Sequence, residues 1–388
     1  MGDGKTVFRG GYGIFYSPIY FQIDYVVNAL GLVDGRRQIA QVLTTIQNPP
    51  PASANNIWTT LRRQGVIGLP SSSRSIEAAD LRQFGINISQ TGPIPPLSVL
   101  FENSPDYVNA YSQQASYGVE RQIGRDLSVS VSGVWVRTLK ITRARNKNLL
   151  ATAPVDPALG IRVWRTQDFA NPLIFQYNVY ESTANAYYSG LIFEVKKRLS
   201  QKLSFAGNYT LSDARDEVTD FNSDFQASDQ TNLRAERSLS AFHQRHKVVV
   251  YGVWGGPGGI NFAPAFRANS ARPFNLIVGT DINNDRHTTT DRPPGAARNT
   301  GIGPAYFGFD MRVSKRIPLG GDTRSLELIA EGFNLSNHLN YSSVNNTVGV
   351  MRGPFNVTGR HDRNPSEPLG FTSALEPRRL QLGLRLSF

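Results

Sequence analysis

The chain of 388 residues contains no cysteine and only three methionines. Without cysteine it can form no disulfide bond, and it offers no thiolate to a metal or a substrate. A third absence is an apolar run of 18 or more residues, which a transmembrane helix requires. The sequence is therefore neither a disulfide-stabilised scaffold, nor a thiol-dependent enzyme, nor a helical membrane protein.

A recognisable export signal is also absent. The first residues, MGDGKTVFRGG, lack the basic start, the apolar stretch and the small-residue cleavage site of a signal peptide. We therefore expect that an exported form of this protein begins upstream of Met1.

Acidic residues are outnumbered, because 41 Lys and Arg stand against 30 Asp and Glu and give a formal charge of +11. A basic chain can bind nucleic acid by releasing counterions from phosphate. Here the charges are dispersed and no nucleic-acid-binding motif is evident, so we predict no nucleic-acid partner. Membrane phosphates and lipopolysaccharide suit the charge equally well.

What the sequence does have is strict alternation of apolar and polar residues. In the last segment, RRLQLGLRLSF, an apolar side chain occupies every second position from Leu380 to Phe388. This pattern predicts a strand with one apolar and one polar face. It recurs at 6–16 and in four predicted hairpins, 115–123 with 127–135, 191–199 with 203–211, 246–254 with 260–268, and 307–317 with 324–333. About ten strands of roughly nine to twelve residues result, the length that a tilted strand needs to cross a bilayer.

The connections between these strands are unequal. Alternate links are tight turns, while the others are long and rich in Pro, Asn, Ser and Arg, at about 17–112, 138–187, 212–245, 271–305 and 335–377. Short turns at one end and long extracellular loops at the other are typical of an outer-membrane barrel. The predicted fold is therefore an all-β, antiparallel transmembrane β-barrel.

Each face of this barrel has its own predicted residues. One face would line a watery lumen with charges of both signs, namely Arg9, Glu120, Glu194, Lys196, Arg198, Asp310, Arg312, Glu327, Glu331 and Arg385. The alternative is the solvated face of a soluble sheet. Three basic residues interrupt the apolar face just before short turns, where they could reach lipid phosphates: Arg121, Lys197 and Lys315. Solvated residues at a hairpin end are the alternative.

The end of the chain carries a candidate assembly signal. Phe388, with Leu384 and Leu386 on the same face, resembles the C-terminal aromatic strand that outer-membrane barrels present to the barrel-assembly machinery. That machinery is therefore a predicted partner.

Candidate metal sites are weak. Asp281, Asn283 and Asp285 have the oxygen spacing of a calcium loop, and Asp291 follows as a further ligand. The sixth position of a tight calcium loop is Gly, but here it is Arg286. The twelfth position is Glu, but here it is Arg292. Calcium is thus a weak prediction against a solvated loop, and no other cofactor is predicted. A histidine pair, His243 and His246, has no obvious third ligand and is predicted to be structural.

Catalysis is not predicted. The acidic loop that contains Asp213, Asp216, Glu217, Asp220 and Asp224 has no paired base. Nothing in the sequence resembles the motifs of outer-membrane proteases.

Several stretches together resemble one family, the TonB-dependent outer-membrane receptors. They are GKTVFRGGYGIFY, VERQIGRDLSVSVSGVW, residues 291–317, EGFNLSNHLNY and LGLRLSF. The Oar-like branch, whose members often carry a carboxypeptidase-regulatory-like domain, is most similar. The resemblance implies a signal peptide, a TonB box, a plug and about 22 strands. The chain shows none of the first three and under half of the strands, so it looks like the C-terminal part of such a barrel.

The resemblance implies a function as well. The long loops would bind an extracellular ligand, and the complete protein would pass it through the lumen in a TonB-coupled manner. The TonB complex would be reached only through the missing N-terminal part. The alternative is a stand-alone ten-stranded pore or adhesin whose first loop, 17–112, covers the opening. The ligand itself is not identified by loop composition.

Overall fold

The structure is a computed structural model that describes residues 4–18, 98–172, 174–320, 324–360 and 362–388, together with Ile23, Val27, 63–65 and Asp80. Its regular elements are strands and four short 3-10 helices. None of the helices in these described ranges is long and apolar enough to cross a membrane.

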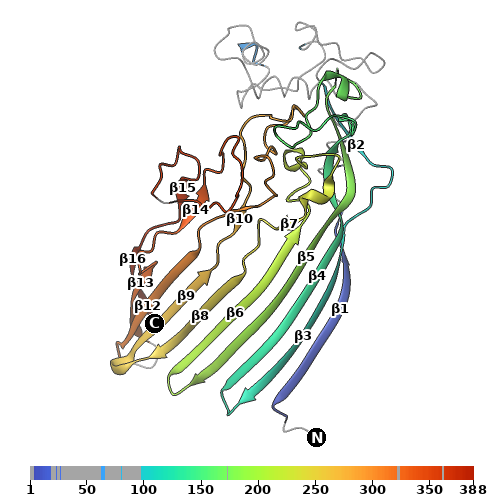
Figure 1. Cartoon of the computed structure of the whole chain (residues 1–388). Helices are drawn as coiled ribbons and strands as arrows, with labels where there is room; N and C mark the ends of the chain where they lie inside the picture. The colour runs from blue at the N-terminus through green and yellow to red at the C-terminus, as the bar shows by residue number, and fades with distance from the viewer. Residues whose placement is uncertain are drawn as a thin grey trace.

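Ten long strands form one continuous antiparallel sheet, which curves along its width in Figure 1. Their order in the sheet is β1, β3, β4, β5, β6, β8, β9, β12, β13 and β16. The bounds are Thr6–Tyr16, Tyr111–Ile123, Leu127–Asn146, Ile174–Ser200, Leu203–Asp216, His246–Gly255, Ile260–Asn269, Tyr306–Pro318, Ser325–Phe333 and Arg379–Ser387. The ten predicted strands and all four predicted hairpins are confirmed.

Tight turns join the hairpins at one end of the sheet, where the N-terminus also lies in Figure 1. The turn between β3 and β4 uses Gly124 at φ 66°, and the turn between β5 and β6 uses Gln201 and Lys202 at φ 50° and 65°. This left-handed backbone suits glycine and is uncommon for other residues. We call this end the turn end and the opposite one the loop end.

Two central strands are longer than the sequence predicted. β4 has 20 residues and β5 has 27, so that 138–146 and 174–187, which were expected to be loop, continue the sheet. The first part of β5 is buried at almost every position rather than at every second one. Because both faces of that part have the same surroundings, the alternation that marks a half-exposed strand is lost there.

The loop end has a structure of its own. β2 (Ser98–Asn103) pairs with β5 in parallel, and β7 (Ser238–Leu239) pairs with β6. Two small two-stranded sheets are formed by β10 (Pro273–Phe274) with β11 (Gly301–Ile302) and by β14 (Tyr341–Val344) with β15 (Phe371–Ala374). The 3-10 helices η1 to η4 are Thr166–Asp168, Ser223–Phe225, Leu233–Glu236 and Pro257–Gly259.

The hydrophobic core lies at the loop end. One cluster of buried side chains consists of Leu149, Ala153, Trp164 and Phe169. A second joins Ile23, Ala144 and Tyr180, with Phe101 and Phe221 packed against it. We call the described residues of the loops at the loop end, together with 138–146 of β4 and 174–187 of β5, the loop body.

The register gives the long strands two different faces. Val119, Val131, Phe193 and Tyr209 are successive cross-strand partners on one face, whereas Glu120, Ser130, Glu194 and Asn208 are partners on the other. Side chains of the apolar face are exposed, as at Phe8 (77%) and Leu382 (84%). An uncovered apolar face of this extent is what a membrane-spanning sheet presents to lipid.

The sheet is open. Among the described strands, β1 pairs only with β3, and β16 pairs only with β13. Each edge strand therefore keeps a row of backbone N–H and C=O groups without a strand partner. In lipid each such unsatisfied group costs several kcal/mol.

Candidate functional site

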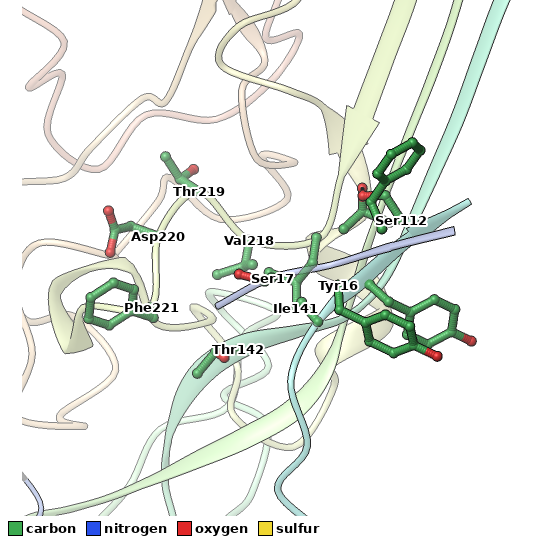
Figure 2. A pocket seen from close by; sticks show the side chains of 13 residues that line it. Tyr16, Ser17, Ser112, Ile141, Thr142, Val218, Thr219, Asp220 and Phe221 are labelled. Carbon is green, nitrogen blue, oxygen red and sulfur yellow. Dashed lines mark hydrogen bonds between the residues drawn. The ribbon is translucent and has the colours of Figure 1, made fainter. Parts of the chain in front are cut away.

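A cavity of about 580 Å³ lies where β1, β3 and β4 reach the loop end (Figure 2). Its strand wall consists of Phe15, Tyr16 and Ser17, then 110–112, and then Thr138, Ile141 and Thr142. The facing wall is the segment 218–221, which follows β6. We call this space the rim cavity.

Strand pairing places the first wall. Phe15 is the cross-strand partner of Ser112, and Ser112 is the partner of Thr138, so the three lie side by side on the polar face. The sequence around Phe15 helps to place its ring, because Gly13 leaves room beside it. A Cβ atom added at Gly13 would lie 3.0 Å from Cε2 of Phe15.

Aromatic residues lie on both walls of the cavity. Phe15, on the polar face of β1, is 57% exposed, whereas Tyr16 is on the apolar face and is 74% exposed. The rings of Tyr16 and Tyr111 are 5.7 Å apart between centroids, at an interplanar angle of 34°. On the facing segment, Phe221 packs against the cluster around Tyr180 and so fixes that segment to the loop body.

Hydroxyl groups line the rest of the cavity. Ser112 Oγ and Thr138 Oγ1 are hydrogen-bonded at 2.9 Å, and Tyr107 Oη bonds Thr142 Oγ1 at 2.9 Å. Thr219 Oγ1 accepts a bond from Arg298 Nη1 at 3.0 Å. Among the described lining residues, Asp220 supplies the single carboxylate, and none is Lys, Arg or His.

A buried ionic cluster holds the facing segment in place. Arg298 bonds both Asp216 and the backbone carbonyl of Glu236, and Arg292 bonds the Glu236 carboxylate at 2.5 and 2.9 Å. Arg143 lies 3.5 Å from Glu217, and burial lowers the pKa of its guanidinium. Removing one partner from such a buried pair typically costs about 3–5 kcal/mol. The cluster therefore anchors 216–219, and with it one wall of the rim cavity.

The predicted lumen residues share one face. The register places nine of the ten on the polar face of six strands, and Arg198, which also belongs to β5, lies at a register shift without a cross-strand partner in the described strands. Three ion-paired groups form there: Arg9 with Glu120 at 3.5 Å, Lys196 with Glu194 at 2.8 Å, and Arg312 with Glu327 and Glu331 at 3.5 and 3.4 Å. Asp310 instead accepts the backbone N–H of Asn334. Their role in a lumen stays a prediction.

The predicted interface residues lie on the apolar face near the turn end. Lys197 Nζ bonds Asp126 in the neighbouring turn at 2.8 Å and also contacts Ser200. Arg121 Nη1 donates to Thr6 Oγ1 at 2.8 Å. Lys315 is the cross-strand partner of Leu328. At least Lys197 thus has a protein partner in addition to any lipid phosphate, and contact with lipid stays a prediction.

The predicted calcium residues come together in a buried loop. Asp285 and Asp291 are each 1% exposed, and Asn283 is 2% exposed. Burial and the charges of Asp291 and Asp281 raise the pKa of Asp285, and burial raises the pKa of Asp291 to about 7. Their oxygens accept backbone N–H groups of the same loop, including Arg286 N to Asp281 and Ile282 N to Asp291. In the described part of the chain no group of three or more His, Cys, Asp or Glu is arranged to hold a metal ion. Calcium binding stays a prediction.

The two histidines are held separately. His243 Nδ1 accepts the backbone N–H of Ala214 at 3.1 Å, and burial lowers the pKa of its imidazole. His246 Nδ1 lies 2.7 Å from Tyr209 Oη. The members of the acidic loop are also dispersed: Asp213 pairs with Arg215 and Arg245, Asp216 with Arg298, and Asp224 with His287.

The predicted assembly signal ends the open edge of the sheet. Leu384 and Leu386 of β16 face Leu328 and Leu326, and Phe388, which follows the strand, is 93% exposed. Recognition by the assembly machinery stays a prediction.

Sequence reasoning missed the rim cavity. Its residues come from three strands and a loop more than 200 positions apart, and only Asp220 had been considered for a site. The one available signal was the aromatic residue Phe15 near the end of a predicted strand that a long loop follows.

The chain is similar to a known protein family and to several solved structures. A family model described as outer membrane beta barrel domain matches residues 1–296 and 294–381, which together cover almost the whole chain. No curated protein matches the sequence.

Among solved structures, the chain is similar to the ferric-catecholate import receptor Fiu of Escherichia coli K12, at 12% identity and a TM-score of 0.42 over 74% of this chain and 29% of that one. It is similar to the outer membrane transporter YddB of E. coli at 11% identity and a TM-score of 0.45, over 81% and 37%. The ferripyoverdine receptor of Pseudomonas aeruginosa gives 14% identity and a TM-score of 0.39, over 72% and 27%. The chain thus spans about a third of the length of these proteins.

Proposed function

Because the chain belongs to the outer membrane beta barrel domain family and is an outer-membrane protein, we propose that it is the C-terminal part of a TonB-dependent receptor barrel of the Oar-like branch. In the complete protein its loop body would bind an extracellular ligand, and the charged polar face would line the path inward. Coupling to TonB would come from the remainder of the receptor. The proposed role is transport and binding, without catalysis.

One observation carries this proposal, the open sheet. Ten strands pair continuously, yet β1 and β16 each present an edge. Since unpaired edges are not tolerated in lipid, each edge needs a partner, which further strands of a larger barrel would supply. A receptor barrel of about 22 strands would supply them on both sides.

The ion pairs on the polar face support the same proposal. Arg312 lies between Glu327 and Glu331, and Arg9 lies beside Glu120. Charged side chains that pair with one another across neighbouring strands suit a water-filled interior. They suit the stand-alone pore as well, so they do not separate the two functions.

The alternative keeps one observation in its favour. β1 and β16 are the two edges of a single sheet, and with an even number of antiparallel strands between them they could pair with each other. A ten-stranded pore or adhesin would result, closed without any other chain segment.

Cysteine cross-linking separates these functions, because the chain has no cysteine of its own. We would make Phe8→Cys with, in turn, Leu382→Cys, Leu384→Cys or Leu386→Cys, and oxidise the whole chain in outer-membrane vesicles. The control pair is Phe8→Cys with Val119→Cys, which are cross-strand partners in β1 and β3. A disulfide requires Cα atoms within about 7 Å.

The proposal expects cross-links in the control pair and none between β1 and β16. Efficient cross-linking between β1 and β16 would show that the ten strands close on themselves. Together with single-channel conductance of the purified chain, that result would replace the receptor segment by the stand-alone pore.

A further inference from the structure

We propose that the rim cavity binds a neutral carbohydrate, a short oligosaccharide of the kind exposed on polysaccharides. This inference rests on the proposed function, because it names the ligand class of the receptor. It is drawn from the lining chemistry of the cavity, which is formed by described residues of β1, β3, β4 and the segment 218–221.

Size and position suit such a ligand. The volume of about 580 Å³ lies within the range of small-molecule sites, about 300–1,000 Å³. The cavity lies at the loop end, on the side that faces the medium in an outer-membrane protein. One wall is built from strands and the other is fixed by the Arg298 cluster, so both walls are positioned before a ligand arrives.

An aromatic ring provides a flat apolar surface. Phe15 is 57% exposed and lies on the polar face of the sheet, beside its cross-strand partner Ser112. Sugar rings present faces of C–H groups that stack on aromatic rings, and they leave their hydroxyls free at the edges. Figure 2 shows Tyr16 on the strand side of the cavity and Phe221 on the other side.

The polar groups match hydroxyls rather than charges. Serine and threonine hydroxyls both donate and accept, as sugar hydroxyls do. Thr219 Oγ1 already accepts from Arg298, so its O–H proton is directed toward another acceptor. Asp220 Oδ1 already accepts the backbone N–H of Asn222 at 2.9 Å, and a hydroxyl group that donates to this carboxylate would make a strong charge-assisted hydrogen bond.

The charge of the lining argues against the main rivals. None of the described lining residues is cationic, so these residues offer no counter-charge to a phosphate or an anionic iron chelate. A cationic peptide would find one carboxylate, Asp220. The surrounding hydroxyls of Ser17, Ser112, Thr138, Thr142 and Thr219 would then contribute little to its affinity.

Titration calorimetry on the purified chain in a detergent without sugar groups tests the proposal. The probes are four neutral trisaccharides, namely maltotriose, cellotriose, xylotriose and N-acetylchitotriose. Trilysine is the cationic comparison, and a ferric tricatecholate is the anionic one. Folding is checked for each sample by its shifted mobility on unheated gels.

The proposal expects saturable binding of at least one trisaccharide. Phe15→Ala is expected to weaken it at least tenfold, and Asp220→Asn severalfold. Tyr117→Ala is the matched control: this tyrosine is 65% exposed on the apolar face, outside the cavity, and its loss is expected to leave binding unchanged. A second variant, Gly13→Val, changes no lining residue. Its side chain displaces the Phe15 ring and is therefore expected to weaken binding as well.

Folded protein that binds none of the four trisaccharides would overturn the inference, and so would binding that Phe15→Ala leaves unchanged. Binding of trilysine or of the ferric chelate alone would assign the cavity to that charged class instead. These outcomes are independent of the edge cross-links. A chain that closes on itself can still bind sugar, and a receptor segment can fail to do so.

Discussion

The turn end and the loop end of this molecule satisfy their side chains in opposite ways. Along the strands toward the turn end, large apolar residues such as Phe8, Val131 and Leu384 remain exposed. At the loop end, the apolar residues Trp164, Leu100 and Leu276 are almost fully buried. The buried apolar side chains of the described residues all belong to the loop end, so the hydrophobic core is built outside the membrane-facing sheet.

This contrast shows that the sheet and the loop body of one chain fold in two different solvents, lipid and water. Lipid accepts the apolar face, so the sheet needs no protein core and is held by its strand pairing. Water does not, so the loop body must bury its apolar groups and pair its charges as a soluble domain does. The rim cavity lies on the boundary between the sheet and the loop body. Three experiments test the comparison of the two ends.

The largest effect is expected from Trp164→Ala. Trp164 is 1% exposed, and its Nε1–H donates to the carbonyl of Leu150 at 3.0 Å. Removing such a buried aromatic side chain typically costs about 3–5 kcal/mol. Segment-resolved hydrogen exchange should show faster opening of the loop body, with the long strands unchanged.

The matched control is Trp254→Ala. Trp254 is 47% exposed on the apolar face and stacks on Phe262 with a centroid distance of 5.3 Å. It should leave the loop body unaffected. Equal acceleration of exchange in the strands of the Trp164→Ala protein would show that the sheet and the loop body unfold as one unit.

A charge on one face of the sheet should have the next largest effect. Val131→Arg places a cation on the apolar face of β4, between its cross-strand partners Val119 and Phe193, where it is expected to cost about 2–4 kcal/mol. Ser132→Arg places the same cation one position along, on the polar face, and should cost much less. Urea unfolding of the two proteins in lipid vesicles gives the comparison. Similar losses would mean that Val131 does not face lipid.

The smallest effect concerns pH at the base of the loop body. Burial lowers the pKa of His243, whose neutral Nδ1 accepts the N–H of Ala214. Because the folded state disfavours the charged imidazole, this stability is fully present above the unfolded pKa of about 6.5 and is lost as the pH falls below it. Protease cleavage near Ala214 should therefore be faster at pH 5 than at pH 7.5.

The control for this prediction is His243→Asn, whose amide oxygen can accept the same N–H without titrating. Comparing the two proteins at each pH cancels the pH dependence of the protease and of the buried carboxyls, whose raised pKa values act in the opposite direction. If the Asn variant keeps the full pH dependence, His243 is not its cause.

Much of the sheet could be predicted from the sequence because each long strand separates lipid from a polar interior. Because of that separation, apolar and polar residues alternate along 115–123 and 380–388, and the hairpins can be predicted. The projecting halves of β4 and β5 could not be read, because their two faces share one environment. The short strands β2, β7, β10, β11, β14 and β15 were missed for a related reason, because a strand of two to six residues is too short to show a clear alternation.

The ten long strands, the four hairpins, the two faces and the family resemblance can be read from the sequence alone, because these depend on neighbouring residues and on alternation. The folded structure is needed to show which residues of distant strands and loops contact one another. It brought Phe15, Ser112, Thr138 and Asp220 around one cavity and placed Arg298 between Asp216 and Glu236. The physical reason is that such contacts come from long-range strand pairing and loop packing, and neither leaves a local signal in the chain.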